Sequence, residues 1–110
     1  SSAVKIGNTV YLAGQIGLSP NSTELPETML EQTHQVFKNL TQMAKASGGN
    51  LSDIVKINVY LSDMANFSVI NELMAEYFMQ PYPARTTLGV KQLPKNALVE
   101  VDAILVVNNP

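Results

Sequence analysis

The chain begins with a strand-like pattern of apolar residues. Val4-Lys5-Ile6 and Val10-Tyr11-Leu12-Ala13 flank Gly7-Asn8-Thr9, a stretch typical of a tight turn. The second apolar stretch is expected to continue to Ile16. The pattern therefore predicts an opening β-hairpin.

The next pattern has the period of a helix. Between Pro26 and Ser47 apolar side chains recur every three or four residues, at Met29, Leu30, Val36, Phe37, Leu40, Met43 and Ala44. Pro26 and Glu27 suit a first helical turn, and Gly48-Gly49 is typical of a helix end. We therefore predict a helix over 26–47.

A strand and a second helix follow. Apolar residues alternate with polar ones over 55–61, which predicts a strand whose buried face is formed by Val55, Ile57, Val59 and Leu61. The next stripe has helical spacing and consists of Phe67, Ile70, Leu73, Met74, Tyr77 and Phe78. Asp63 and Asn66 are both candidate caps for this helix, and Pro81 and Pro83 are expected to stop it.

Two closing strands are predicted at 84–90 and 98–107. The order of elements predicts one α+β domain over residues 1–110, with a single sheet covered by two helices on one face. The last strand is apolar on both faces, and no third helix is available to cover it. Association of subunits through the bare face is the solution that the pattern favours. The simplest local prediction joins the last two strands as a hairpin.

Composition changes this picture in three respects. Charged residues make up only 15% of the 110 residues, which favours burial of part of the surface against another subunit. The net charge of −2 and the pI near 5.2 make a nucleic-acid partner unexpected. The chain has no cysteine, no signal peptide and no apolar run long enough to cross a membrane. We therefore expect a soluble cytoplasmic protein without a membrane partner.

Two charges in apolar strands are the candidate chemistry. Arg85 begins one closing strand and Glu100 lies within the other, and a charge beside a sheet core is costly unless it is paired or used. An arginine fork suits a carboxylate, and a glutamate can activate water. Together they indicate hydrolysis of a small carboxylate-bearing molecule. A surface ion pair for Arg85, and a solvated face shared by Glu100 and Asp102, are equally compatible with the pattern.

The single histidine, His34, lies at the edge of the first helical stripe. One histidine cannot build a histidine-based metal site, and no acid–base triad is visible around it. A structural or surface role is expected for this residue.

Several separated motifs resemble the Rid proteins, the reactive intermediate deaminases, also known as the endoribonuclease L-PSP or translation-inhibitor family. The resemblance covers nearly the whole chain in order. Its motifs are Gly7 to Gly17, Gly48 to Lys56, Pro83-Ala84-Arg85-Thr86-Thr87, Leu93-Pro94-Lys95 and Val99 to Ile104.

The resemblance implies a chorismate-mutase-like fold with one mixed sheet, assembled as a homotrimer whose active sites lie between subunits. In that fold the final strand is central, next to the first. RidA-like members hydrolyse 2-imino acids and their enamine tautomers, such as 2-aminoacrylate and 2-iminobutanoate. The products are 2-keto acids and ammonia, and the resemblance implies that no metal or organic cofactor is needed.

The same resemblance implies roles for single residues. Arg85 matches the arginine that binds the substrate carboxylate, and Glu100 matches the acid that positions water near the imine carbon. Asn71 matches an asparagine near the cleft, and Gly14 matches a glycine whose backbone lies against the ligand. Thr87, where some relatives carry cysteine, completes the expected substrate-binding set.

Two other differences between this sequence and those of its relatives concern the cleft. Ala13 stands where many relatives carry serine. Relatives usually have a Gly-Pro-Tyr stretch just before the position of Ser1, and its ring helps to wall the cleft.

Two other functions are open at this point. Some family members are associated with ribonuclease activity or inhibition of translation, although the acidic pI disfavours this for the present chain. The same cleft is also compatible with a binding protein that captures small carboxylates without turning them over.

Overall fold

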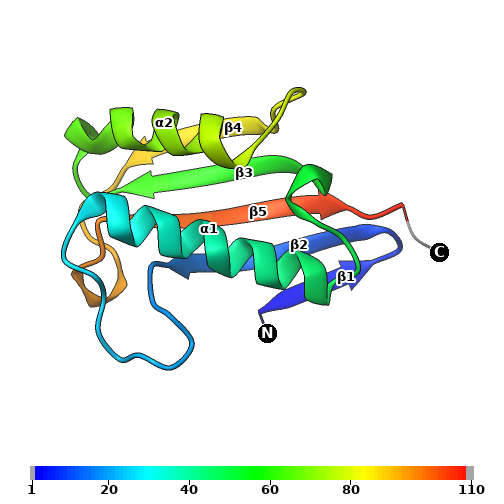
Figure 1. The fold of residues 1–110 in the computed structure, drawn as a ribbon, viewed down its shortest axis with the longest axis horizontal. Coiled ribbons are helices and arrows are strands. Elements are labelled where there is room, and N and C mark those ends of the chain that lie inside the picture. Colours follow the sequence, from blue (N-terminus) through cyan, green and yellow to red (C-terminus); the bar gives the residue numbers. More distant parts are fainter. Residues whose placement is uncertain (1, 109–110) are drawn as a thin grey trace.

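The computed structural model of the chain describes residues 2–108 and contains one five-stranded sheet and two helices (Figure 1). The strands are β1 (Ala3–Ile6), β2 (Thr9–Ile16), β3 (Ile54–Leu61), β4 (Ala84–Gly89) and β5 (Val99–Val106). The helices are α1 (Met29–Ala46) and α2 (Phe67–Tyr77), and short 3-10 turns lie at Leu51–Asp53, Met64–Asn66 and Pro94–Asn96. The predicted α+β class and order of elements are confirmed.

The strand order is β1-β2-β5-β3-β4. The β3–β4 pair is parallel and the other three pairs are antiparallel, so the sheet is mixed. The predicted hairpin of the last two strands is wrong, because β5 crosses to the middle of the sheet. Its central position agrees with the expectation from the family resemblance, although its neighbour on that side is β2, the second strand of the hairpin. A strand with many apolar side chains is stabilised most where both of its edges and one face are covered.

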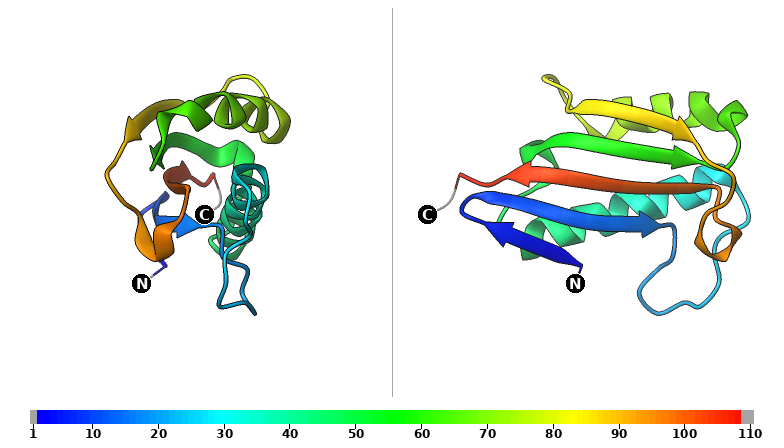
Figure 2. Two further views of the ribbon diagram at one scale, coloured as in Figure 1. Left: turned by 90° about the vertical axis from the view of Figure 1, so that its left-hand side faces the viewer. Right: turned by 180° about the vertical axis from the view of Figure 1, so that it is seen from behind.

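Both helices cover the same face of the sheet, as the end-on view in Figure 2 shows. The core between the helices and the sheet includes fully buried side chains from both layers, among them Phe37, Leu40, Ile57, Ile70, Val101 and Leu105. Within residues 2–108 no helix covers the opposite face, which we call the open face. Its outward residues include Val4, Ile6, Tyr11, Leu88 and Val106, each at least 37% exposed. Within residues 2–108, none of the helices has the length and apolar character needed to span a membrane.

Helix α1 begins later than predicted, at Met29 instead of Pro26. The reason is the N-cap residue Thr28, whose hydroxyl oxygen accepts a hydrogen bond from the Glu31 backbone N–H at 3.1 Å. The predicted end is confirmed, since Ser47 is the C-cap and Gly48 has a φ of +90°.

The two candidate caps of α2 have different roles. Asp63 accepts a hydrogen bond from the Ala65 N–H and caps the 3-10 turn that leads into the helix. Asn66 is the N-cap of α2 itself, without a side-chain hydrogen bond. The predicted stripe is confirmed at Ile70, Leu73 and Met74, which are buried.

Strand β3 departs from simple alternation at its first residues. The register against β5 shifts between Ile54 and Lys56, so Ile54 is buried and Val55 is 49% exposed. The prediction that Val55 belongs to the buried face is therefore wrong, because an irregularity in the pairing reverses the side-chain direction locally. From Ile57 onward the alternation holds.

Candidate functional site

Arg85 lies on the helix-covered face of the edge strand β4. It pairs with Ile57 of β3, whose side chain is fully buried under the helices. The Arg85 Nη2 donates a hydrogen bond to Asn71 Oδ1 of α2 at 2.8 Å. Its guanidinium carbon also lies 5.3 Å from the centre of the Phe67 ring, a cation–π distance. Two side chains of α2 therefore hold the guanidinium, and no carboxylate among residues 2–108 forms an ion pair with it.

Thr87 lies two residues further along the same strand and faces the same side. Its hydroxyl oxygen is buried and has no hydrogen-bond partner within residues 2–108. Because a buried hydroxyl usually finds a partner, an unpaired one beside a cationic side chain is suited to a ligand. Arg85, Asn71 and Thr87 are therefore three predicted site residues on one side of the sheet.

A cavity of about 520 Å³ opens beside Arg85, between α2 and the segment that leads into β4. Its lining consists of Asn71, Met74, Ala75, Tyr82, Pro83 and Arg85. The polar groups of Arg85 and Asn71 belong to one part of the lining, and the remaining four residues are mostly apolar. Such a cavity matches the usual composition of a small-molecule site.

Glu100 and Gly14 meet on the other side of the sheet. The pairing of β2 with β5 shifts between Leu12 and Gln15, and this irregularity brings the Gly14 backbone against the Glu100 side chain. A Cβ atom added at Gly14 would overlap the Glu100 carboxylate. A side chain at this position would therefore have to move the flexible end of Glu100 aside.

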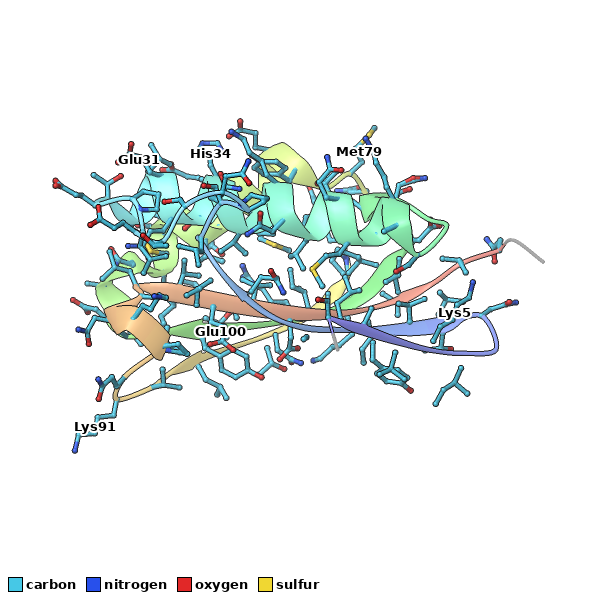
Figure 3. All side chains as sticks on the ribbon, turned by 90° about the horizontal axis from the view of Figure 1, so that it is seen from below. Lys5, Glu31, His34, Met79, Lys91 and Glu100 are labelled. Carbon is cyan, nitrogen blue, oxygen red and sulfur yellow. The ribbon has the colours of Figure 1, made fainter. Side chains whose placement is uncertain are left out.

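Glu100 faces away from the helices, as Figure 3 shows from below. It pairs with Tyr60 of β3, and both side chains point to the open face. The neighbouring Asp102 accepts hydrogen bonds from Asn58 Nδ2 at 2.7 Å and from the Tyr60 hydroxyl at 2.9 Å. The bond to Asp102, together with desolvation and the charges of Asp102 and Glu100, raises the pKa of Tyr60. The hydroxyl therefore keeps its proton and donates a hydrogen bond to Asp102.

The predicted site residues thus form two groups on opposite faces of one chain. Arg85, Asn71 and Thr87 lie on the helix-covered side at the β4 edge, whereas Gly14 and Glu100 lie on the open face. Strand β3 separates β4 from β5, so the two charges are not neighbours in the sheet. One chain alone does not bring Arg85 and Glu100 to a common ligand.

Two residues of the site were missed by sequence reasoning. Phe67 belongs to the predicted core stripe of α2, yet its ring also lies against Arg85. Phe67 and Asn71 are one helical turn apart in α2, so helical spacing is the signal that links Phe67 to Asn71. Tyr82 lies outside the predicted site, although its place just before Pro83 and Arg85 puts it on the cavity wall.

His34 lies outside both groups. Its Nδ1 is 2.8 Å from the hydroxyl of Tyr77, and the two rings meet edge to face. This contact ties α1 to α2, in agreement with the structural role predicted for His34.

Comparison with known proteins gives a consistent result. The family pattern described as Endoribonuclease L-PSP matches residues 1–107. A 2-iminobutanoate/2-iminopropanoate deaminase of Dermatophagoides farinae is 44% identical over 97% of this chain and 84% of its own length. The protein of the same name from Mus musculus is 40% identical over 96% of this chain and 79% of its own.

Solved structures agree with the sequence comparison. The crystal structure of RidA from an Antarctic Psychrobacter species matches with a TM-score of 0.94 and 45% identity, over 96% of this chain and 86% of that one. Yeast Mmf1 matches with a TM-score of 0.92 and 39% identity, over 96% and 85% of the two chains. The chain belongs to the endoribonuclease L-PSP family, which includes the reactive intermediate deaminases.

Proposed function

We propose that this protein hydrolyses 2-imino acids, and their enamine tautomers, to 2-keto acids and ammonia. The observation that carries the proposal is an arginine held by Asn71 and Phe67, without a carboxylate partner among residues 2–108, beside the unpaired hydroxyl of Thr87. Such a group is preorganised for a small carboxylate. Relatives at 40% and 44% identity named 2-iminobutanoate/2-iminopropanoate deaminase support the choice of reaction.

The reaction adds water to the imine carbon and expels ammonia, so that R–C(=NH)–COO⁻ and H2O give R–CO–COO⁻ and NH3. In our proposal Arg85 binds the carboxylate through two parallel hydrogen bonds, and the Thr87 hydroxyl donates to it. Glu100 accepts a proton from the attacking water and returns it to the departing nitrogen. Holding substrate and water in position supplies much of the rate enhancement, because a protonated imine carbon is already electrophilic.

The assembly in this proposal is a homotrimer, with each site formed between two copies. Arg85 and Glu100 lie on opposite faces of the sheet, so a second copy is needed to bring a glutamate to the arginine. The exposed apolar side chains of the open face support association. A cytoplasmic location completes the proposal and agrees with a sequence free of cysteine.

The first test is an imine hydrolysis assay. A serine dehydratase would generate 2-aminoacrylate, and the loss of imine absorbance would be followed with and without the protein. We expect clear acceleration, and a fall in kcat/KM of at least about 100-fold in Arg85→Ala, because charged hydrogen bonds to the substrate are lost. Lys45→Ala, which removes an exposed cation in the last turn of α1, is the matched control and should keep wild-type activity. Full activity in Arg85→Ala would rule out the assigned role.

Mixing two inactive variants tests the shared site. Glu100→Gln should lower kcat by roughly 10²- to 10⁴-fold, since the proton acceptor is lost. When Arg85→Ala and Glu100→Gln chains are unfolded together in equal amounts and refolded, about a quarter of the sites should combine an intact arginine with an intact glutamate. The activity of the refolded mixture should return to about a quarter of the wild-type activity. No recovery would exclude a site formed between copies.

Binding without turnover is the second candidate function. Its basis is that the arginine group is complete in one chain, whereas Glu100 is not part of it. Stabilisation of the protein by pyruvate, without acceleration of imine loss, would favour this candidate. RNA cleavage is the remaining alternative. If heat-inactivated protein degrades RNA as fast as the native protein does, this alternative is excluded.

A further inference from the structure

Phe67 is the aromatic residue of α2 that meets the cation of the candidate site. The guanidinium of Arg85 lies over its ring, with the guanidinium carbon 5.3 Å from the ring centroid. We propose that Phe67 is a positioning residue, which holds the guanidinium plane so that Arg85 meets the substrate carboxylate with its hydrogen-bond donors aligned. This role rests on the carboxylate binding proposed above and names a residue on which the affinity depends.

The Arg85 side chain has to be ordered before it binds well. An arginine that binds a carboxylate through two parallel hydrogen bonds presents one edge of a flat group in a fixed direction. Arg85 is only half-buried, and among residues 2–108 no ion pair fixes its direction. A ligand that has to order a long side chain itself binds more weakly. Contacts that order Arg85 in the free protein therefore raise the affinity for a carboxylate.

The two contacts of Arg85 with α2 restrict different motions. Its Nη2 donates to Asn71 Oδ1 at 2.8 Å, which fixes one N–H but leaves rotation about that hydrogen bond free. The Phe67 ring lies against one face of the guanidinium and restricts this rotation. The amide and the phenyl ring are both neutral, so the positive charge stays available. The bond to Asn71 uses one of the five N–H donors, and the ring uses none.

The burial of Phe67 agrees with a role beyond core packing. Ile70 and Leu73 of the same stripe are at most 1% exposed, whereas Phe67 stays partly exposed at the margin of the core. One part of its ring packs against the core while Arg85 lies over its face. Leucine at position 67 would keep an apolar contact with the core and a high helix propensity, but it would offer the cation no ring.

The first test removes the ring and measures affinity. An L-amino acid oxidase would generate the imine of alanine for kinetics, and calorimetry would measure the Kd of pyruvate. Phe67→Leu should raise KM and Kd by about three- to tenfold, the range expected for a half-buried cation–π contact. Its kcat should stay within about twofold of the wild type, because the lost contact serves bound substrate and transition state alike. Phe67→Tyr, which keeps a ring face, should keep the wild-type KM and Kd.

Phe78→Leu is the matched control, because it makes the same substitution in the same stripe. The Phe78 ring is 5% exposed and packs edge to face against Phe37 of α1. This variant should therefore lose stability and keep the wild-type KM and Kd. An unchanged Kd in Phe67→Leu, or an equal rise of Kd in Phe78→Leu, would overturn the role assigned to Phe67.

Nitrogen NMR of the ligand-free protein provides a readout that does not depend on turnover. It measures the rotation of the Arg85 guanidinium about its Nε–Cζ bond. We expect this rotation to be about fivefold faster in Phe67→Leu than in the wild type or in Phe78→Leu. Equal rotation rates in the three proteins would overturn the assignment. If the imine is not hydrolysed faster than in buffer, the proposed reaction fails, and the rotation rates still decide the role of Phe67.

Discussion

At the scale of single residues, Gly14 has the most restricted position in the site. Its backbone lies so close to the Glu100 carboxylate that a side chain at this position would push the carboxylate aside. The shifted register of β2 creates this approach, and glycine at position 14 makes it possible. In the proposed reaction, the glutamate's position therefore depends on a residue that contributes no side chain.

The substitution Gly14→Ala should displace the Glu100 carboxylate. We expect hydrolysis to fall by about 100-fold, since small misplacements of catalytic groups have effects of this order. The free energy of unfolding should change by less than about 1 kcal/mol, because the flexible end of the Glu100 side chain can move aside. Urea unfolding and the imine assay would measure the two effects.

Gly48→Ala is the matched control for this prediction. Gly48 has a positive φ and no side chain nearby, so alanine there should cost about 1–2 kcal/mol of stability. Activity per folded molecule should stay at the wild-type level. Undiminished activity in Gly14→Ala would show that Glu100 does not need its present position.

At the scale of elements, the buried Gln32 of α1 connects two loops. Its Nε2 donates to the Pro26 carbonyl at 2.8 Å, and its Oε1 accepts from the Leu98 N–H at 2.9 Å. The side chain is only 4% exposed, so both bonds are shielded from water. Gln32 thus fixes the backbone immediately before β5, two residues from Glu100.

Gln32→Ala should destabilise the protein by about 1–3 kcal/mol, because the Pro26 carbonyl and the Leu98 N–H lose their partner. Gln42→Ala, on the exposed side of the same helix, should change stability by less than about 0.5 kcal/mol. The midpoints of urea denaturation would compare the two variants. Equal midpoints would mean that water replaces the lost hydrogen bonds.

The difference between local and long-range contacts explains which features the sequence predicts. The helical stripe of α2 and the alternation over 57–61 depend on neighbouring residues, so periodicity is sufficient to find them. The exposure of Val55 and the insertion of β5 between β2 and β3 depend on hydrogen bonds between distant segments, which periodicity does not contain. Arg85 and Glu100 could be chosen as unusual charges in apolar strands, yet their opposite faces follow only from the register.

At the scale of the whole molecule, the open face is the surface on which apolar side chains remain exposed. It presents a group of exposed apolar side chains on β1, β2, β4 and β5, while its centre carries the hydrogen bonds of Asp102. Apolar groups of this kind usually mark an interface. The proposed trimer would cover them.

Tyr11→Lys should therefore dissociate the assembly, because it places a charge among these side chains. Sedimentation velocity should show a monomer for this variant and a trimer for the wild type, with unchanged circular dichroism. Leu30→Lys on α1 is a close control, since Leu30 is 47% exposed and Tyr11 is 46% exposed. A trimer of normal stability for Tyr11→Lys would place the interface elsewhere.

The separation of Arg85 and Glu100 on the two faces of the sheet has a consequence for the behaviour of the protein in dilute solution. If each site takes its two charges from different copies, the number of working sites follows mass action and not the amount of chain alone. Below the dissociation constant of the assembly, specific activity would fall with dilution while every chain stays folded. A cell could then set its capacity to remove imino acids more steeply than in proportion to the amount of protein that it makes.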